Sequence, residues 1–177
     1  MNCKEELELI FPTKEYKNQI EEYLQEHFDN GEYELNGTGG LYRIKNFDEW
    51  LEKIQTDVNK EFNENTVPAT LFMGVRKSDN KVVGLLQIRH KLNKKLLKNC
   101  GHIGYGVRPS ERRKGYATEM IRLALIECKK LGIDRVLICC NSDNIGSKKS
   151  ILKNGGVLEN IVMEDGKPME RYWIEIK

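Results

Sequence analysis

The stretch that most constrains this chain runs from Gly101 to Ala117 and reads GHIGYGVRPSERRKGYA. Its first part, His102 to Val107, is short, contains glycine and partly alternates, which is typical of a strand. Pro109 ends that strand, because it donates no backbone N–H and pushes the preceding residue into an extended conformation. From Gly115 onward the apolar residues recur at helical intervals. They are Ala117, Met120, Ile121, Ala124, Cys128 and Leu131. The stretch therefore predicts a strand, a basic turn and a helix.

The turn between this strand and this helix is strongly basic. Arg112, Arg113 and Lys114 stand directly before Gly115. The first backbone N–H groups of a helix have no intrahelical partner, and the helix dipole makes that end positive. Because Gly115 and Ala117 are small, a ligand can come close to the main chain. We therefore expect an anion site here, most simply for a di- or polyphosphate.

Two familiar phosphate-binding loops do not fit the stretch. A dinucleotide fingerprint needs a third glycine after Gly104 and Gly106, and Pro109 occupies the matching position. The Walker pattern needs Gly-Lys followed by Ser or Thr, and no such triplet follows a glycine at the right spacing. The sequence therefore leaves Arg-x-x-Gly-x-Ala, which opens an amphipathic helix after a strand.

Composition limits the classes of protein that remain. The chain has 177 residues, long enough for one domain with a real core, so we expect a single domain over residues 1–177. Lys and Arg total 29 against 27 Asp and Glu, and this near-balance argues against a general binder of nucleic acid or membrane surfaces. No apolar run approaches the ~20 residues of a membrane span. The N-terminus, MNCKEELELI, is too acidic for a secretory signal, so we expect a cytoplasmic protein.

The cysteines are consistent with a reducing compartment. Their number is odd and no two of them form a C-x-x-C pair, so the sequence predicts neither a disulfide framework nor a metal site. The five cysteines are Cys3, Cys100, Cys128, Cys139 and Cys140. Cys139 and Cys140 lie in the most apolar predicted strand, where a buried cysteine usually acts as a small hydrophobic residue. A nucleophilic cysteine is the less favoured alternative.

The rest of the chain predicts the order β-α-α-β-β-β-α-β-α-β-β. Upstream of the central stretch we expect a strand over Glu5–Phe11, a helix over Thr13–Asp29 capped by Thr13, a second helix containing Phe47–Val58 that starts near Asn46 or Asp48, and a hairpin of Ala69–Arg76 and Lys81–Arg89. Downstream we expect a strand over Asp134–Cys140, a helix over Asn144–Lys153, and a hairpin of Val157–Glu164 and Met169–Ile176. Leu92–Asn99 is interpreted as a polar connection. The order implies an α/β (α+β) protein with a mixed, mostly antiparallel central sheet flanked by helices.

Two motifs in this order resemble the GNAT acyltransferase superfamily. Arg112-x-x-Gly115-x-Ala117 resembles its pyrophosphate loop, Gln/Arg-x-x-Gly-x-Gly/Ala. The run from Asn144 through Ser147 to Gly156 is similar to the Asn-x-x-Ala/Ser…Tyr…Gly-Phe signature after the fifth GNAT strand. The predicted element order also looks like that fold over the whole chain. On these motifs the chain is identified as a member of the family, in a branch resembling predicted small bacterial acetyltransferases.

The resemblance implies acetyl-CoA as cosubstrate and no metal. Its pyrophosphate would lie on the N–H groups from Arg113 to Thr118, and its pantetheine arm would hydrogen-bond near Val107. Asn144 would contact the cofactor, although an N-cap is the structural alternative and the two roles are compatible. The implied cofactor-binding residues are Val107, Arg112, Arg113, Lys114, Gly115, Tyr116, Ala117, Thr118, Asn144 and Ser147.

The implied chemistry is direct attack of a neutral amine on the thioester. A backbone N–H near Tyr105 would stabilise the oxyanion. An alkylamine has a pKa near ~10.4, so a general base or a water chain is expected. His102 is the candidate base, and a histidine held at the start of a strand is the structural alternative. His90 is the next candidate, whereas His27, on a helix stripe, is interpreted as structural.

One position departs from the family pattern. The usual general acid is a Tyr, and here Ile151 occupies its place and cannot donate a proton. Ser147 and Ser150 lie on the same predicted helix, but the pattern singles out neither. The role of general acid therefore has no candidate in the sequence.

Two functions remain open. The favoured one is an N-acetyltransferase acting on the primary amine of a small molecule or a peptide. The alternative is a non-catalytic acyl-CoA-binding sensor or regulatory protein. Acceptor recognition is expected from Asp48, Glu49, Trp50 and Glu64. We expect a monomer or a homodimer through the C-terminal hairpin.

Overall fold

The computed structural model describes residues 6–44 and 46–177. Cys3 and the first residue of the predicted strand Glu5–Phe11 lie outside the described residues. The helices and strands are β1 (Leu7–Ile10), α1 (Lys17–Asp29), α2 (Phe47–Asp57), β2 (Ala69–Arg76), β3 (Lys81–Arg89), α3 (Lys94–Asn99), β4 (Ile103–Val107), α4 (Tyr116–Lys130), β5 (Arg135–Asn141), α5 (Ile145–Lys153), β6 (Val157–Glu164) and β7 (Lys167–Glu175). Short 3₁₀ turns at Lys14–Tyr16 and Pro109–Glu111 precede α1 and follow β4. The predicted order is confirmed, with α3 as an additional short helix.

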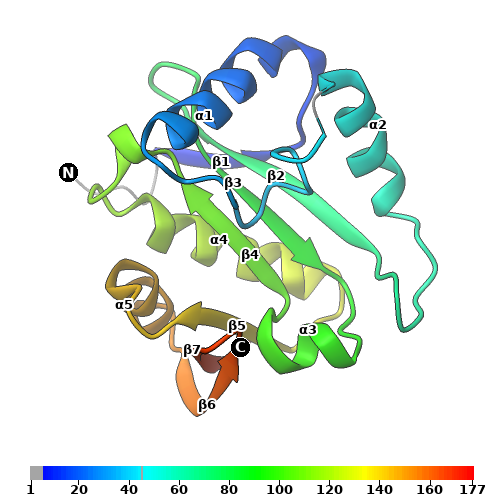
Figure 1. The fold of residues 1–177 in the computed structure, drawn as a ribbon, viewed down its shortest axis with the longest axis vertical. Helices are drawn as coiled ribbons and strands as arrows, with labels where there is room; N and C mark the ends of the chain where they lie inside the picture. The colour runs from blue at the N-terminus through cyan, green and yellow to red at the C-terminus, as the bar shows by residue number, and fades with distance from the viewer. Residues whose placement is uncertain (1–5, 45) are drawn as a thin grey trace.

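The strands form two sheets. The first has the order β1-β2-β3-β4 and the second β5-β7-β6, and every ladder in both is antiparallel. The predicted α/β class with a largely antiparallel sheet flanked by helices is therefore confirmed. The expected parallel neighbours, β4 and β5, form no ladder. They meet only at an isolated bridge between Gly101 and Ile138, and Figure 1 shows them close together near α3 and diverging away from it.

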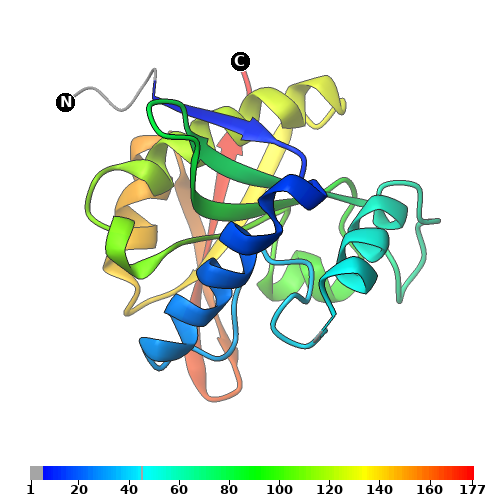
Figure 2. The same ribbon diagram turned by 90° about the horizontal axis from the view of Figure 1, so that it is seen from above.

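Helices cover both faces of the first sheet. Figure 2 shows α1 and α2 on one side of it and α4 on the other. The core under α1 and α2 contains Ile20, Trp50 and Leu85, whereas the core under α4 contains Met120, Leu86 and residues of the second sheet. Because α4 packs on both sheets, it fixes how β4 and β5 sit relative to each other.

Asparagine side chains begin three of the helices. Asn46 accepts a hydrogen bond from the Glu49 N–H at 3.1 Å, Asn93 from the Leu96 N–H at 3.0 Å and Asn144 from the Ser147 N–H at 3.1 Å. The predicted cap of Thr13 is wrong, since only its backbone oxygen takes part, at 3.1 Å from the Tyr16 nitrogen. A 3₁₀ turn therefore opens this segment before α1 starts.

Candidate active site

The free edge of β4 exposes backbone donors toward β5. The Arg89 N–H donates to the His102 oxygen at 2.7 Å, and the Arg108 N–H donates to the Val83 oxygen at 2.8 Å. Because bonded residues alternate along an antiparallel ladder, the N–H groups of Tyr105 and Val107 point away from β3. They face the gap where the two sheets part.

Beside this gap, the start of α4 contacts α5. The Thr118 hydroxyl of α4 donates to the Ser150 hydroxyl of α5 at 3.2 Å, and the Asn154 amide donates to the Thr118 carbonyl at 3.0 Å. The first turn of α4 is thus tied to the second half of α5 and to its C-terminal cap residue.

The basic turn before α4 has the backbone of an anion site. Gly115 has a φ of 87° and Arg113 a φ of 62°, both in the left-handed region. The first intrahelical bond runs from the Glu119 N–H to the Gly115 oxygen, at 3.2 Å. The N–H groups of Tyr116, Ala117 and Thr118 therefore lie ahead of the helical hydrogen-bond ladder and are oriented outward for a ligand.

Two of the three cations expected to serve this site bind carboxylates instead. Arg112 donates to both Glu32 oxygens at 2.6 Å and through Nε to the Val107 oxygen at 3.0 Å. These bonds lower the pKa of Glu32 to about 2. Lys114 donates to Glu111 at 2.8 Å. Within residues 6–44 and 46–177, Arg113 takes part in no ion pair, so it is the cation best placed for a phosphate.

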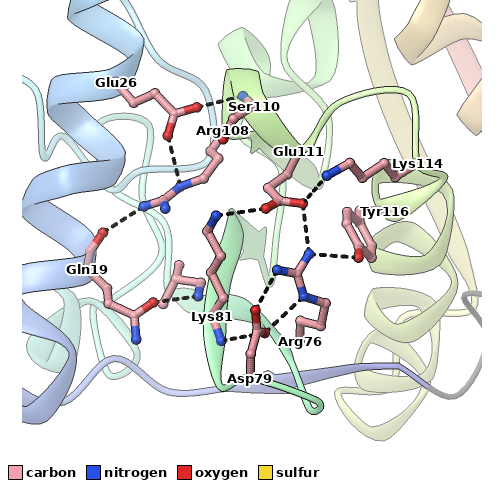
Figure 3. Close-up of polar contacts among 11 residues, drawn as sticks. Gln19, Glu26, Arg76, Asp79, Lys81, Arg108, Ser110, Glu111, Lys114 and Tyr116 are labelled. Atoms are coloured by element: carbon pink, nitrogen blue, oxygen red, sulfur yellow. Dashed lines mark hydrogen bonds and ion pairs between the residues drawn. The ribbon is translucent and has the colours of Figure 1, made fainter.

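The buried carboxylate of Glu111 holds the basic turn before α4 in place (Figure 3). Glu111, whose side chain is 4% exposed, accepts hydrogen bonds at 2.8 Å from each of Arg76, Lys81 and Lys114. Burial alone would raise the pKa of Glu111, but the bonds from these three cations outweigh it and lower the pKa to about 2. Arg76 also contacts the Tyr116 hydroxyl at 3.1 Å. The β2–β3 hairpin is thereby tied to the start of α4.

A second carboxylate joins the turn to α1, as Figure 3 also shows. Glu26 accepts the Ser110 N–H at 2.6 Å and lies 3.4 Å from the Arg108 Nε. Arg108 donates in addition to the Gln19 carbonyl at 3.1 Å. No sequence pattern pointed to Glu26 or Glu111, because all of their partners except Lys114 are distant along the chain.

A side-chain pair crosses the gap between β4 and α5. The Tyr105 phenol oxygen lies 2.5 Å from the Ser147 hydroxyl oxygen. Burial raises the pKa of Tyr105 to about 12, so the phenol keeps its proton. Ile151, at the position where the family pattern has Tyr, is fully buried. The structure thus offers a phenol from the opposite strand, where sequence reasoning used only the backbone of Tyr105.

His102 is held in the tautomer least suited to a base. Its Nδ1 accepts the Leu137 N–H at 3.0 Å, which leaves the proton of the neutral ring on Nε2. Burial, and then the nearby charge of Arg89, lower the pKa of His102 to about 4. This geometry matches the structural alternative, a histidine hydrogen-bonded at the start of a strand. His90 contacts Thr70 at 2.7 Å and His27 contacts Glu32 at 2.6 Å.

Residues 12–157 match the Acetyltransferase (GNAT) domain family, which is more than half of the chain. The chain belongs to this family. No curated protein matches it. The solved GNAT structures that it resembles carry the same fold at low sequence identity.

Three of these structures illustrate the likeness. The microcin C7 self-immunity acetyltransferase MccE, in complex with acetyl-CoA and AMP, is 19% identical with a TM-score of 0.71, covering 99% of this chain and 96% of that chain. Mycobacterium smegmatis RimJ, in complex with a CoA disulfide, is 16% identical with a TM-score of 0.72, covering 96% and 81%. The Salmonella typhimurium acetyltransferase that modifies the N-terminal serine of the 50S ribosomal subunit protein L7/L12 is 16% identical with a TM-score of 0.67, covering 98% and 96%.

The cysteines of the GNAT core are protonated thiols. Burial raises the pKa of Cys139 and of Cys128 to about 12 and also raises that of Cys140. A thiol with such a pKa is a poor nucleophile at neutral pH. Among the residues that the structure describes, no group of three or more His, Cys, Asp or Glu is placed to hold a metal ion. In the same residues, no helix is long and apolar enough to cross a membrane.

The face of the first sheet under α1 and α2 differs from the sequence expectation. Trp50 is fully buried and donates through Nε1 to the Thr38 carbonyl at 2.8 Å, so its expected contact with an acceptor is wrong. Asp48 and Glu49 remain exposed on α2. The loop after α1 instead lies directly on β4, where a Cβ on Gly37 would be 2.5 Å from the Gly104 oxygen. The backbone of this loop and the buried side chain of Tyr23 therefore border this face of the strand, and Trp50 does not.

Proposed function

We propose that this GNAT protein transfers an acetyl group from acetyl-CoA to the primary amine of a small molecule or a peptide. The observation that carries the proposal is the open edge of β4. Its outward N–H groups at Tyr105 and Val107 stand beside the Tyr105–Ser147 pair and next to the first turn of α4. If the thioester carbonyl binds at this edge, the Tyr105–Ser147 pair lies close to the leaving sulfur and can donate a proton to it.

The cofactor would be held mainly by main-chain donors. The N–H groups of Tyr116, Ala117 and Thr118 would bind the pyrophosphate, with Arg113 adding charge. Arg112 and Lys114 would act through Glu32 and Glu111, which keep the turn in shape. The Val107 N–H would bind the pantetheine arm.

The start of α5 would contribute the remaining cofactor contacts. The Asn144 amide oxygen caps α5 by accepting the Ser147 N–H, which leaves its amide nitrogen for the cofactor. Asn144 would thus combine the two roles expected from the sequence, and Ser147 would lie beside the thioester through its contact with Tyr105.

The reaction is a direct transfer. The amine nitrogen forms a bond to the acyl carbon, the carbonyl oxygen takes negative charge, and the Tyr105 N–H stabilises it. Collapse breaks the carbon–sulfur bond, and the thiolate takes a proton from the Tyr105–Ser147 pair. The proton lost by the amine leaves through water, and water then returns a proton to the pair. No covalent enzyme intermediate is required.

The Leu137 N–H occupies the acceptor nitrogen of His102, and this argues against His102 as the base. The amine would therefore react from the fraction that is neutral in solution. The relatives support this chemistry at the level of class. One is described as modifying the N-terminal serine of a ribosomal protein and another as a microcin self-immunity acetyltransferase.

The alternative is a non-catalytic acyl-CoA sensor, favoured by the replacement of the usual tyrosine with buried Ile151. The phenol of Tyr105 weakens this alternative, since it supplies the donor that Ile151 lacks. The two functions differ in turnover and not in binding of the cofactor.

The deciding experiment measures free-thiol release from acetyl-CoA with polyamines, amino acids, aminoglycosides and short peptides. The wild type is compared with Gly115→Trp, which blocks the phosphate turn, and with Gly132→Trp at the exposed far end of α4 as the control. We expect release that depends on one amine class and disappears only in Gly115→Trp. Binding of acetyl-CoA without amine-stimulated release would favour the sensor instead.

A further inference from the structure

Arg89 lies at the meeting point of β3 and β4, on the acceptor side. Its backbone N–H donates to the His102 oxygen at 2.7 Å and its Nη1 to the Gly101 oxygen at 3.0 Å. Its Nη2 is 3.3 Å from the point where a Cβ on Gly104 would stand, and the Gly37 nitrogen is 3.2 Å from the same point. Two nitrogen atoms thus lie close to the bare Cα of Gly104.

This face of β4 is opposite to the one that carries the Tyr105 phenol. Side chains alternate along a strand, so Gly104 and Gly106 face the loop after α1 and the buried Tyr23. Tyr105 packs with the core under α4 and α5. If the cofactor lies on the helix side, the amine must approach from the side of Arg89.

Arg89 has no carboxylate partner within residues 6–44 and 46–177, since no ion pair there includes it. The thiols of Cys100 and Cys139 are its neighbours, and the neighbouring His102 is neutral. Its guanidinium keeps its charge, because arginine does not lose its proton in proteins. A partly buried cation without a counter-ion is costly.

Other inward-facing arginines of the protein are each paired. The side chains of three of them are 16%, 5% and 10% exposed, and each contacts a carboxylate. These three are Arg76 with Glu111, Arg108 with Glu26, and Arg171 with Glu159. Arg89 therefore differs from these three, because no carboxylate among the described residues balances its charge. It lies beside Gly104, the residue before Tyr105, and the Tyr105 N–H is the group that would hold the acyl oxygen.

We propose that Arg89 binds an anionic group of the acceptor, so that the substrate is an amine that also carries a carboxylate or a phosphate. This inference rests on the proposed acetyltransferase function. A planar guanidinium matches either oxyanion through two parallel hydrogen bonds. The acceptor's anion supplies the missing counter-charge, and the Gly37 N–H adds a further donor. Polyamines, which bring only positive charge, are disfavoured by the same cation.

The test compares matched acceptors with and without an anion. Phenylalanine is paired with phenylalanine amide, and O-phosphoethanolamine with ethanolamine, which separates carboxylate from phosphate. We expect the wild type to prefer the anionic member of at least one pair. Arg89→Gln lowers kcat/KM for that acceptor at least tenfold, mainly through KM, and changes kcat/KM for the neutral member less than twofold. Arg89→Lys restores part of the loss. Arg122→Gln, at an exposed cation on α4 paired with Glu119, leaves both unchanged.

Three outcomes would overturn the inference. They are a wild type that prefers neutral acceptors, an equal loss for both members in Arg89→Gln, and no loss at all. Absence of turnover with every amine would count against the proposed function instead. In that case calorimetry with CoA-saturated protein still decides, because N-acetylphenylalanine should bind at least tenfold more tightly than its amide and lose this advantage in Arg89→Gln. Equal binding of the two would refute the role of Arg89 independently of catalysis.

Discussion

The Tyr105 phenol oxygen lies 2.5 Å from the Ser147 hydroxyl oxygen and links the free edge of β4 to the first turn of α5. This pair occupies the gap between the two sheets where the carbon–sulfur bond of the cofactor would break. The aligned family position, Ile151, is packed in the core one turn further along α5. In the proposed mechanism the proton donor therefore comes from the strand and not from the helix.

Removing the phenol should slow turnover without weakening the cofactor complex. Proton donation by a positioned side chain contributes roughly 10²-fold to 10⁴-fold, and the lower end applies because a thiolate is a tolerable leaving group. Tyr105→Phe should thus lower kcat about 100-fold and leave the acetyl-CoA KM within threefold. Ser147→Ala should cost less, and the double variant should be no worse than Tyr105→Phe alone. Tyr33→Phe, at an exposed tyrosine, is the control. Full activity in Tyr105→Phe would remove the phenol from the mechanism.

The pH profile should report the substrate and not a histidine. The lowered pKa of His102, about 4, keeps its ring neutral above that pH, and the raised pKa of Tyr105, about 12, keeps its phenol protonated. The logarithm of kcat/KM should rise with unit slope from pH 6 toward the pKa of the amine, ~10.4 for an alkylamine. Initial rates at saturating acetyl-CoA measure this. A plateau beginning near pH 6.5 that disappears in His102→Gln would instead make His102 the base.

Glu111 should stabilise the fold in a pH-dependent way. Its pKa falls from 4.5 in the unfolded chain to about 2 in the folded protein, so its contribution is complete above pH 4.5 and is lost as the pH falls toward 2. Glu111→Gln should lower the free energy of unfolding at pH 7 by about 3 kcal/mol, because it leaves Arg76, Lys81 and Lys114 without their shared anion. Thermal melts at pH 7, 4.5 and 2.5 should show the gap from the wild type shrinking below pH 4.5. Glu175→Gln, in an exposed pair with Arg135, should change little. A gap that stays constant down to pH 2.5 would contradict this account.

Gly115 should matter for the cofactor beyond its backbone strain. Gly115 and Gly132 flank the two ends of α4 with φ values of 87° and 74°. Alanine at either position should cost about 1 kcal/mol of stability, since a Cβ disfavours this conformation. Only Gly115→Ala should also raise the acetyl-CoA Kd, by tenfold or more, as titration calorimetry would measure. Equal Kd values in the two variants would place the phosphate elsewhere.

Substitutions of the cations in the turn before α4 should differ in whether they weaken acetyl-CoA binding or lower the melting temperature. Arg113→Gln should raise the Kd for acetyl-CoA about fivefold and reduce its salt dependence, with the melting temperature unchanged. Arg112→Gln should lower the melting temperature, because it leaves Glu32 without its bidentate partner. Paired measurements of Kd and melting temperature test the distinction. Loss of stability in Arg113→Gln would show that this side chain has a structural partner.

Local patterns were enough to predict most of the elements. The spacing of apolar residues predicted α4, and Gly115 marked the start of α4 as expected. The short helix α3 was missed, although Asn93 carried a capping signal, because six residues show too little periodicity. The single central sheet expected from the element order is divided into two in the structure, because β4 and β5 diverge on α4.

Side-chain partners were harder to predict than elements. Arg112 and Lys114 were expected to serve a phosphate, yet Glu32 and Glu111 bind them. Trp50 was expected at the acceptor site and lies in the core. In each case the residue type was recognised from the sequence. Its neighbours in the folded protein decided which group its charge binds or where its apolar surface is buried.

The sequence by itself determined the strand–turn–helix unit, the GNAT family and the position of the basic turn before α4, because periodicity, proline, glycine and capping act between residues close along the chain. Only the tertiary structure decided which groups meet in the gap. Tyr105 with Ser147, Glu111 with its three cations, and Arg89 with no anion all depend on contacts across long sequence separations. Those contacts are set by the packing of two sheets on one helix, and no local pattern encodes them.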